Sequence, residues 1–337
     1  MGTIAIVQTA FIGDVILATP LFEAARTANI DNTIVGVVRK GCENLLENNP
    51  FVDEIVVWDK RGKDSGIIGI ARIASRLRKL GVETALIPHR SLRSATALKL
   101  SGAKTRIGFA KGGGAFLHTE QVEYTLGIHE VERNLMLAGA AGWDHEGFTP
   151  SVFYDADDKR IVDNVLRGIN TYCVLSPGSV WATKRWPAEY FAAAGYHFAV
   201  QGLPVIISGG AGDREICEQV TEKIPGAVNA CGRLSLRQSA ELYSRAKFLL
   251  TGDTAPQHLA AAVGARVFSI FGPTVKDLGF WPYSERGTVI EESMDCRPCG
   301  AHGHKKCPIG IHVCMKNITP GRVAGIIDET LNGKNNI

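Results

Sequence analysis

Short apolar runs alternate with segments of helical periodicity along most of this 337-residue chain. Such alternation predicts parallel β-strands whose sheet is covered by the intervening helices, so the expected fold class is α/β. The predicted strands, some with the loop that follows, are 3–8, 33–38, 54–58, 84–89, 172–179, 204–210, 247–253 and 266–274. The predicted helices are 14–27, 66–81, 186–202, 213–224, 235–246, 319–331 and one that begins at 255.

The alternation stops between residues 143 and 160, where Pro150 and several acidic residues interrupt it. One core rarely grows beyond about 250–300 residues, so a chain of this length favours two domains. We therefore expect two doubly wound α/β halves with a boundary in this interval.

The bulk composition, 45% apolar with a formal net charge of +3, argues against nucleic acid as a partner. No basic segment precedes an apolar one at the start, so we expect no signal peptide. The most apolar window, 190–208, is broken by His197, Gly202 and Pro204, which predicts no membrane span. We expect a cytosolic protein, or one held at a membrane surface.

Four predicted strands of the second half end in small polar loops, "SPGS", "SGGAGD", "TGDTAPQH" and "FGPT". Ligands of open α/β sheets bind beyond the carboxyl ends of the strands, so these loops favour a nucleotide or phosphate site. The nearest approach to a dinucleotide fingerprint, "GAGDRE" at 210–215, has Glu215 in place of the last glycine. This departure argues against a nicotinamide oxidoreductase.

The segment "GDTAPQH" at 252–258 has two compatible interpretations. In the first, Asp253 or Thr254 caps the following helix and Pro256 lies in its first turn. In the second, the helix start binds an anion through backbone N–H groups. The predicted donors are the amides of Thr254, Ala255, Gln257 and His258. Asp253 itself repels phosphate, so we expect it to hold the loop or to bind sugar hydroxyls.

Two further polar positions lie where a strand passes into a helix. Lys184 and Arg185, in "SPGSVWATKRWP" at 176–187, are either a charged loop or cations that neutralise a departing diphosphate without a metal. Asp14, in "FIGDVILATP" at 11–20, is either a helix cap or a general base for an acceptor hydroxyl.

The motifs around Asp14 and Lys184 resemble those of family 9 glycosyltransferases. The resemblance extends to three further segments: "PHRSLRSATALKLSGAKTRIGF" at 88–109, "GDTAPQHLAAAVGARVFSIFGPT" at 252–274 and the cysteine-rich 296–323. These glycosyltransferases are the ADP-heptose:lipopolysaccharide heptosyltransferases and their relatives, and the cysteine-rich segment most resembles the heptosyltransferase II branch. The resemblance implies a GT-B fold, two Rossmann-like domains facing a cleft. It assigns 1–155 to acceptor binding and 156–318 to nucleotide-sugar binding, with 319–337 crossing back to the first domain.

The resemblance also implies inverting transfer of heptose from ADP-L-glycero-D-manno-heptose to the lipopolysaccharide inner core, without an obligatory divalent metal. It implies that Asp14 is the catalytic base and that Lys184 contacts the diphosphate. The implied nucleotide-sugar site comprises Ser179, Thr183, Lys184, Asp253, Thr254, Ala255 and His258. Asp213 is a candidate contact for the ribose. The alternatives are another family 9 transferase, a sugar-nucleotide epimerase, or a non-catalytic nucleotide- or carbohydrate-binding protein.

The basic stretch over 90–111 is either a solvated face or a site for an anionic acceptor. In the second case Arg90 and Arg93 bind carboxylates or phosphates of a lipid-linked core oligosaccharide. The protein would then work at the cytoplasmic face of the inner membrane, in peripheral contact with it.

Four of the eight cysteines, Cys296, Cys299, Cys307 and Cys314, cluster late in the chain. Their number suits a structural zinc site, although the spacing matches no strong zinc-finger pattern. A packed thiol-rich loop and a disulfide are the alternatives.

Overall fold

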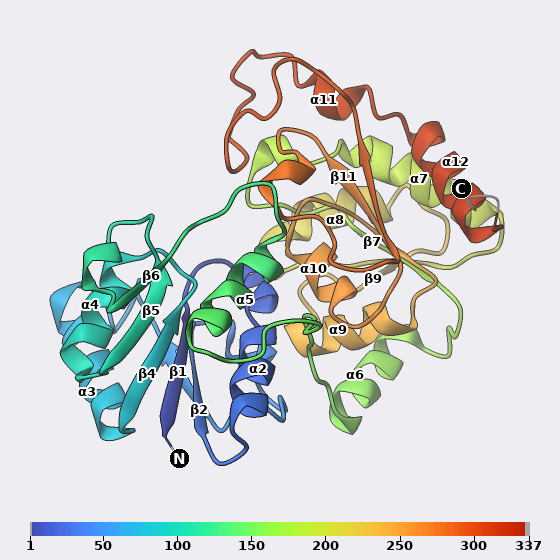
Figure 1. Ribbon diagram of the computed structural model, residues 1–337. Helices are drawn as coiled ribbons and strands as arrows, with labels where there is room; N and C mark the ends of the chain where they lie inside the picture. Colours follow the sequence, from blue (N-terminus) through green and yellow to red (C-terminus); the bar gives the residue numbers. More distant parts are fainter. Residues whose placement is uncertain (1, 334–337) are drawn as a thin grey trace. The chain divides into compact units, whose positions relative to one another are not determined.

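The computed structural model describes residues 2–333, and the chain divides into two compact units that meet between Phe153 and Tyr154. Each unit is built on a six-stranded parallel sheet with helices packed on it (Figure 1). The first sheet contains β1 (Thr3–Gln8), β2 (Thr33–Arg39), β3 (Glu54–Trp58), β4 (Val82–Ile87), β5 (Thr105–Phe109) and β6 (Glu120–Val122). The second contains β7 (Cys173–Ser176), β8 (Val205–Ile207), β9 (Val228–Asn229), β10 (Leu249–Gly252), β11 (Val267–Phe271) and β12 (Gly287–Glu291).

The strand order is β3-β2-β1-β4-β5-β6 in the first sheet and β12-β11-β10-β7-β8-β9 in the second. Numbered from its own first strand, each sheet has the same doubly wound order, 3-2-1-4-5-6. This order is the one found in Rossmann folds, so the predicted fold class is confirmed. It creates a switch point in each sheet, between β1 and β4 and between β7 and β10, where successive crossovers run in opposite directions.

The central strands are apolar because helices cover both of their faces. In β2, for example, the five residues between Thr33 and Arg39 are all buried. The helices of the first unit are α1 (Ile12–Leu17), α2 (Pro20–Ala28), α3 (Gly66–Lys79), α4 (Leu92–Ser101) and α5 (Glu130–Ala140). Those of the second are α6 (Ala156–Leu166), α7 (Ala188–Val200), α8 (Arg214–Thr221), α9 (Leu236–Arg245), α10 (Ala255–Ala261), α11 (Val313–Lys316) and α12 (Pro320–Leu331).

The predicted helix over 14–27 is wrong as a single element, because α1 ends at Leu17 and α2 begins at Pro20. Proline has no N–H to donate, and its ring clashes with the carbonyl one turn earlier, so it starts a helix better than it continues one. The break shortens α1 and places Asp14 in its first turn.

The last helix, α12, packs along α7 inside the second unit. His197 of α7 and Asp328 of α12 lie 2.8 Å apart, between Nε2 and Oδ2. The expected crossing of this helix to the first unit stays a prediction. Within residues 2–333, no helix combines the length and the apolar character that crossing a membrane requires.

Candidate functional site

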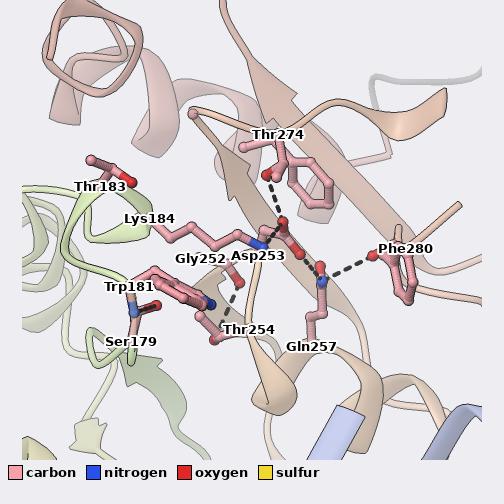
Figure 2. A network of polar contacts seen from close by, with 12 residues as sticks. Ser179, Trp181, Thr183, Lys184, Gly252, Asp253, Thr254, Gln257, Thr274 and Phe280 are labelled. Atoms are coloured by element: carbon pink, nitrogen blue, oxygen red, sulfur yellow. Dashed lines mark hydrogen bonds and ion pairs between the residues drawn. The ribbon is translucent and has the colours of Figure 1, made fainter. Parts of the chain in front are cut away.

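The switch point of the second sheet gathers the polar residues that the sequence singled out. The loop after β7 carries Ser179 and leads into a short 3-10 turn at Ala182–Lys184. The loop after β10 carries Asp253 and leads into α10. Because β7 and β10 are neighbours in the sheet, their two loops meet at one edge (Figure 2).

Lys184 and Asp253 form an ion pair at this edge, with 2.5 Å between Nζ and Oδ2. Their side chains are only 11% and 6% exposed, so the pair is largely shielded from water. The Asp253 carboxylate also accepts hydrogen bonds from Thr274 Oγ1 at 2.6 Å and Gln257 Nε2 at 2.9 Å. Gln257 Nε2 donates in addition to the Phe280 carbonyl at 3.0 Å, which ties α10 to a distant loop (Figure 2).

The cysteine-rich segment holds the turn that carries Lys184. The Thr183 N–H donates to the His304 carbonyl at 3.1 Å, and Thr183 Oγ1 accepts from the His304 N–H at 2.7 Å. Gly303 lies so close that an added Cβ would stand 2.6 Å from Trp181 Cβ and 2.9 Å from Lys184 Cγ. Residues 303 and 304 therefore hold the backbone of the turn that positions the Lys184 side chain.

The start of α10 departs in part from the predicted anion cradle. Thr254 occupies the N-cap position, but its side chain makes no capping bond. Its amide donates to the Gly252 carbonyl at 2.8 Å, and the Gln257 amide donates back to the Thr254 carbonyl at 3.1 Å. Two of the four predicted amide donors are thus already engaged. Ala255 opens the helix, and His258 is buried beside the Gln257 side-chain amide.

Ser179 and Asp213 lie at the same edge. Ser179 is buried, and its Oγ accepts from the Trp181 N–H at 3.2 Å. Asp213 accepts from the Gly210 N–H at 2.9 Å and faces the loop after β7. A Cβ added to Gly178 would stand 2.2 Å from the Asp213 carboxylate carbon, so only glycine fits beside this side chain.

In the first unit, Asp14 is the third residue of α1, so it caps the helix from position N3 of a capping box and not from the N-cap position itself. Its carboxylate accepts from the N–H of Phe11, the residue at the N-cap, at 3.1 Å. The nearby Glu130 is buried and pairs with Arg133, which also donates to Tyr124 Oη at 2.7 Å. Burial raises the pKa of Glu130 to about 7, Arg133 opposes that rise, and the charge of Asp14 adds to it.

The basic residues of the stretch over 90–111 differ in burial. Arg90 and Arg93 are exposed, and the Arg90 guanidinium stacks 4.0 Å from the centre of the Tyr124 ring. Arg106, in contrast, is buried and donates to the Leu117 carbonyl at 2.9 Å, so its charge serves the fold. This difference is not visible along the chain, because all three residues lie in the same run of basic positions.

The late cysteines form no metal site in the structure. Among residues 2–333, no group of three or more His, Cys, Asp or Glu side chains could hold a metal ion. All eight cysteines are free thiols, so the disulfide interpretation is wrong for this structure. Burial is the largest single influence on the pKa of Cys307 and raises it, but the backbone N–H groups of residues 309–312 together hold this pKa below its usual value.

Comparisons with known proteins identify the chain's relatives. The family model "Glycosyltransferase family 9 (heptosyltransferase)" matches residues 70–309. The chain is 28% identical over 165 residues to lipooligosaccharide heptosyltransferase 2 of Campylobacter jejuni, a match covering 47% of this chain and 50% of that protein. It is 24% identical to lipopolysaccharide heptosyltransferase 2 of Escherichia coli, over 95% and 96% of the two chains. The chain thus spans only about half the length of the first of these relatives.

The solved structure of a family 9 glycosyltransferase from Veillonella parvula shares the fold. It aligns with a TM-score of 0.88 at 21% identity, over 98% of each chain.

Proposed function

The chain belongs to glycosyltransferase family 9, and on that premise we propose that it transfers a heptose from ADP-L-glycero-D-manno-heptose to the inner core of lipopolysaccharide. The observation that carries the proposal is the enclosed Lys184–Asp253 pair at the switch point of the second sheet. A nucleotide diphosphate bound at such a point lies beyond the strand ends, within reach of both loops. The names of the two relatives, both heptosyltransferases, support this choice of sugar.

The proposed reaction is a single inverting displacement. The acceptor hydroxyl oxygen bonds to the anomeric carbon of the heptose while the bond from that carbon to the diphosphate oxygen breaks. The hydroxyl proton passes to Asp14, and ADP leaves with the electron pair of the broken bond. Inversion follows because attack and departure occur on opposite faces of the sugar.

Lys184 stabilises the negative charge that develops on the departing diphosphate. Its ammonium group is already held at the strand edge by Asp253, so little reorganisation is needed when the diphosphate binds. The Ala255 amide and His258 complete the nucleotide-sugar site at the start of α10. Asp253 supports Lys184, and Asp213 is proposed to contact the ribose.

This scheme requires no divalent metal, because Lys184 supplies the charge that a metal would otherwise provide. The acceptor is an anionic, lipid-linked core oligosaccharide, so the protein is proposed to act at the cytoplasmic face of the inner membrane in peripheral contact with it.

A structural zinc at Cys296, Cys299, Cys307 and Cys314 would need the thiols to move together. Metal analysis of protein purified without added zinc tests that point.

A mass-spectrometric transfer assay tests the proposal. The purified protein is incubated with ADP-heptose and defined inner-core acceptors, and we expect a product heavier by one heptose together with ADP. Omission of the acceptor is the control, because an epimerase would isomerise the ADP-heptose without it. The proposal would be contradicted if the protein isomerised ADP-heptose without transferring the heptose. It would also be contradicted if the protein bound ADP-heptose and formed neither the transfer product nor the isomer.

A further inference from the structure

The turn that carries Lys184 has little structure of its own. Strand β7 ends at Ser176, and the 3-10 turn Ala182–Lys184 is only 3 residues long. Its N-cap residue, Trp181, supplies no side-chain capping bond. So short a turn is marginal alone, because its hydrogen-bond geometry is poor. The position of Lys184 therefore depends on contacts from other parts of the chain.

Thr183 makes most of these contacts, and Figure 2 shows it beside Lys184 but outside the network around Asp253. Its hydroxyl donates to the His304 carbonyl at 3.1 Å and accepts from the His304 N–H at 2.7 Å. Its N–H donates to the same carbonyl at 3.1 Å. Its own carbonyl accepts from His312 Nε2 at 2.8 Å. All the polar groups of Thr183 are thus bonded to the cysteine-rich segment.

The part of this segment over 302–312 is itself held in place. His304 Nε2 donates to the Cys299 carbonyl at 2.9 Å. The His302 ring lies parallel to the Trp181 ring, with 2° between the planes and 6.4 Å between the centroids. His312 has a left-handed backbone with a φ of 52°, a conformation that costs free energy and persists where surrounding contacts fix it.

A cavity of about 350 Å³ adjoins the turn, lined by Ala182, Thr183, Lys305, Lys306, Cys307, Gly310 and His312. Because side chains do not fill this space, hydrogen bonds rather than close packing hold Thr183 against the segment there. The turn is tightly confined elsewhere, since a Cβ added to Gly252 would stand 2.9 Å from the Lys184 carbonyl oxygen. Loss of the bonds to Thr183 would therefore let the turn move into the cavity and draw Lys184 away from Asp253.

We propose that residues 302–312 are a positioning element of the diphosphate site, in which His304 and His312 hold Thr183 and thereby place the Lys184 ammonium group. This inference rests on the proposed function, since the departing diphosphate is the partner of that ammonium group. A cation fixed in advance stabilises developing charge without reorganising when the bond breaks. His304 and His312 act through Thr183 and Lys184, so both are positioning residues.

Two other roles for these contacts make a different prediction. The segment could merely complete the packing of the second unit, or Thr183 could itself bind the nucleotide. In either case the effects of changing Thr183 and Lys184 on ADP affinity would be independent and would add as free energies. If Thr183 acts through Lys184, its replacement has no further effect on ADP affinity once the Lys184 charge is gone.

Calorimetric titration with ADP and transfer kinetics test the inference. Thr183→Val keeps the branched side chain and removes the hydroxyl. We expect its ADP affinity and its kcat to fall by about 10- to 100-fold, as for the loss of other outer hydrogen-bond partners, with the acceptor KM unchanged. Thr183→Ser keeps the hydroxyl and should behave as wild type. In a Lys184→Met background, Thr183→Val should cause no further loss of ADP affinity.

Thr119→Val is the matched control, because Thr119 makes the same three hydrogen bonds with Arg106 in the first unit. Its N–H donates to the Arg106 carbonyl at 2.9 Å, and its Oγ1 accepts from the Arg106 N–H at 2.7 Å and donates to that carbonyl at 3.3 Å. Its ADP affinity and kcat should equal those of wild type.

His312→Asn is a second variant that keeps the test decisive if Thr183→Val does not fold. Asparagine tolerates a left-handed backbone, and its shorter side chain withdraws the donor from the Thr183 carbonyl. We expect this variant to lose ADP affinity and kcat in the same direction as Thr183→Val.

The inference would be overturned by additive losses in the Thr183→Val, Lys184→Met pair, by wild-type ADP affinity in folded His312→Asn, or by an equal loss in Thr119→Val. Failure of Thr183→Ser to retain ADP affinity would also overturn it. If Lys184→Met binds ADP as tightly as wild type, the proposed diphosphate contact fails together with the inference. Absence of heptose transfer by a wild type whose ADP affinity depends jointly on Thr183 and Lys184 would overturn only the proposed reaction.

Discussion

Replacing Lys184 by methionine tests the ion pair on which the proposed nucleotide-sugar site depends. The change keeps the length of the side chain and removes the charge that lies 2.5 Å from Asp253 Oδ2. Asp253 then remains enclosed, but Thr274 Oγ1 and Gln257 Nε2 still donate to its carboxylate. The loss in free energy of unfolding should therefore lie at the lower end of the range measured for breaking a buried ion pair.

Breaking a buried pair costs about 3–5 kcal/mol, so we expect about 3 kcal/mol here. For a unit of roughly 150–250 residues, each kcal/mol shifts the melting temperature by about 2–4 °C, which gives a fall of about 6–12 °C. If Lys184 also stabilises the leaving diphosphate, kcat should drop by about 100- to 1000-fold, as for the loss of one preorganised charge partner. ADP affinity should weaken as well.

Thermal unfolding, ADP titration and transfer kinetics on Lys184→Met, Asp253→Asn and the double variant separate these effects. The double variant should be less destabilised than the sum of the single variants, with a coupling of about 0.5–3 kcal/mol. Additive stability losses would show that the two side chains do not depend on one another. Full turnover in folded Lys184→Met would refute the leaving-group role.

Three other variants test the first unit. Asp14→Ala should keep ADP affinity and lose about 100- to 10,000-fold in turnover, because a general base is removed, and full activity in the transfer assay would refute that role. The folded-state pKa of Glu130, about 7, lies above the ordinary 4.5, so its contribution to stability is present below about pH 4.5 and is lost as pH rises towards 7. Urea unfolding from pH 4.5 to 7.5 should show Glu130→Gln gaining stability relative to wild type, whereas parallel curves would contradict this assignment. Neutralising Arg90 and Arg93 should raise the acceptor KM and spare binding of the nucleotide sugar, and unchanged acceptor kinetics would exclude them from the acceptor site.

The sequence predicts strands that are continuous apolar runs and misses short polar ones. The predicted strands 3–8 and 54–58 coincide with β1 and β3, because an apolar run flanked by polar residues is typical of a strand in an α/β sheet. The edge strand β6, Glu120–Val122, has no such run, since two of its three residues are exposed. Its pairing with β5 defines it, and that pairing is not visible along the chain.

The candidate site was predictable where loop chemistry follows directly from a strand end. Lys184, Asp253 and Asp14 were found in this way, and the structure places the first two in contact. Glu130 was missed because a single charged residue in polar surroundings indicates an exposed position. Its burial comes from packing against other elements of the first unit, so only the folded unit reveals it.

The two sheets repeat one strand order, and each has its own switch point. Under the proposed function, the sugar nucleotide binds at the switch point of the second unit and the acceptor binds to the first unit. Substitutions in the loops of one unit could then change one specificity while the core of the other unit stays intact.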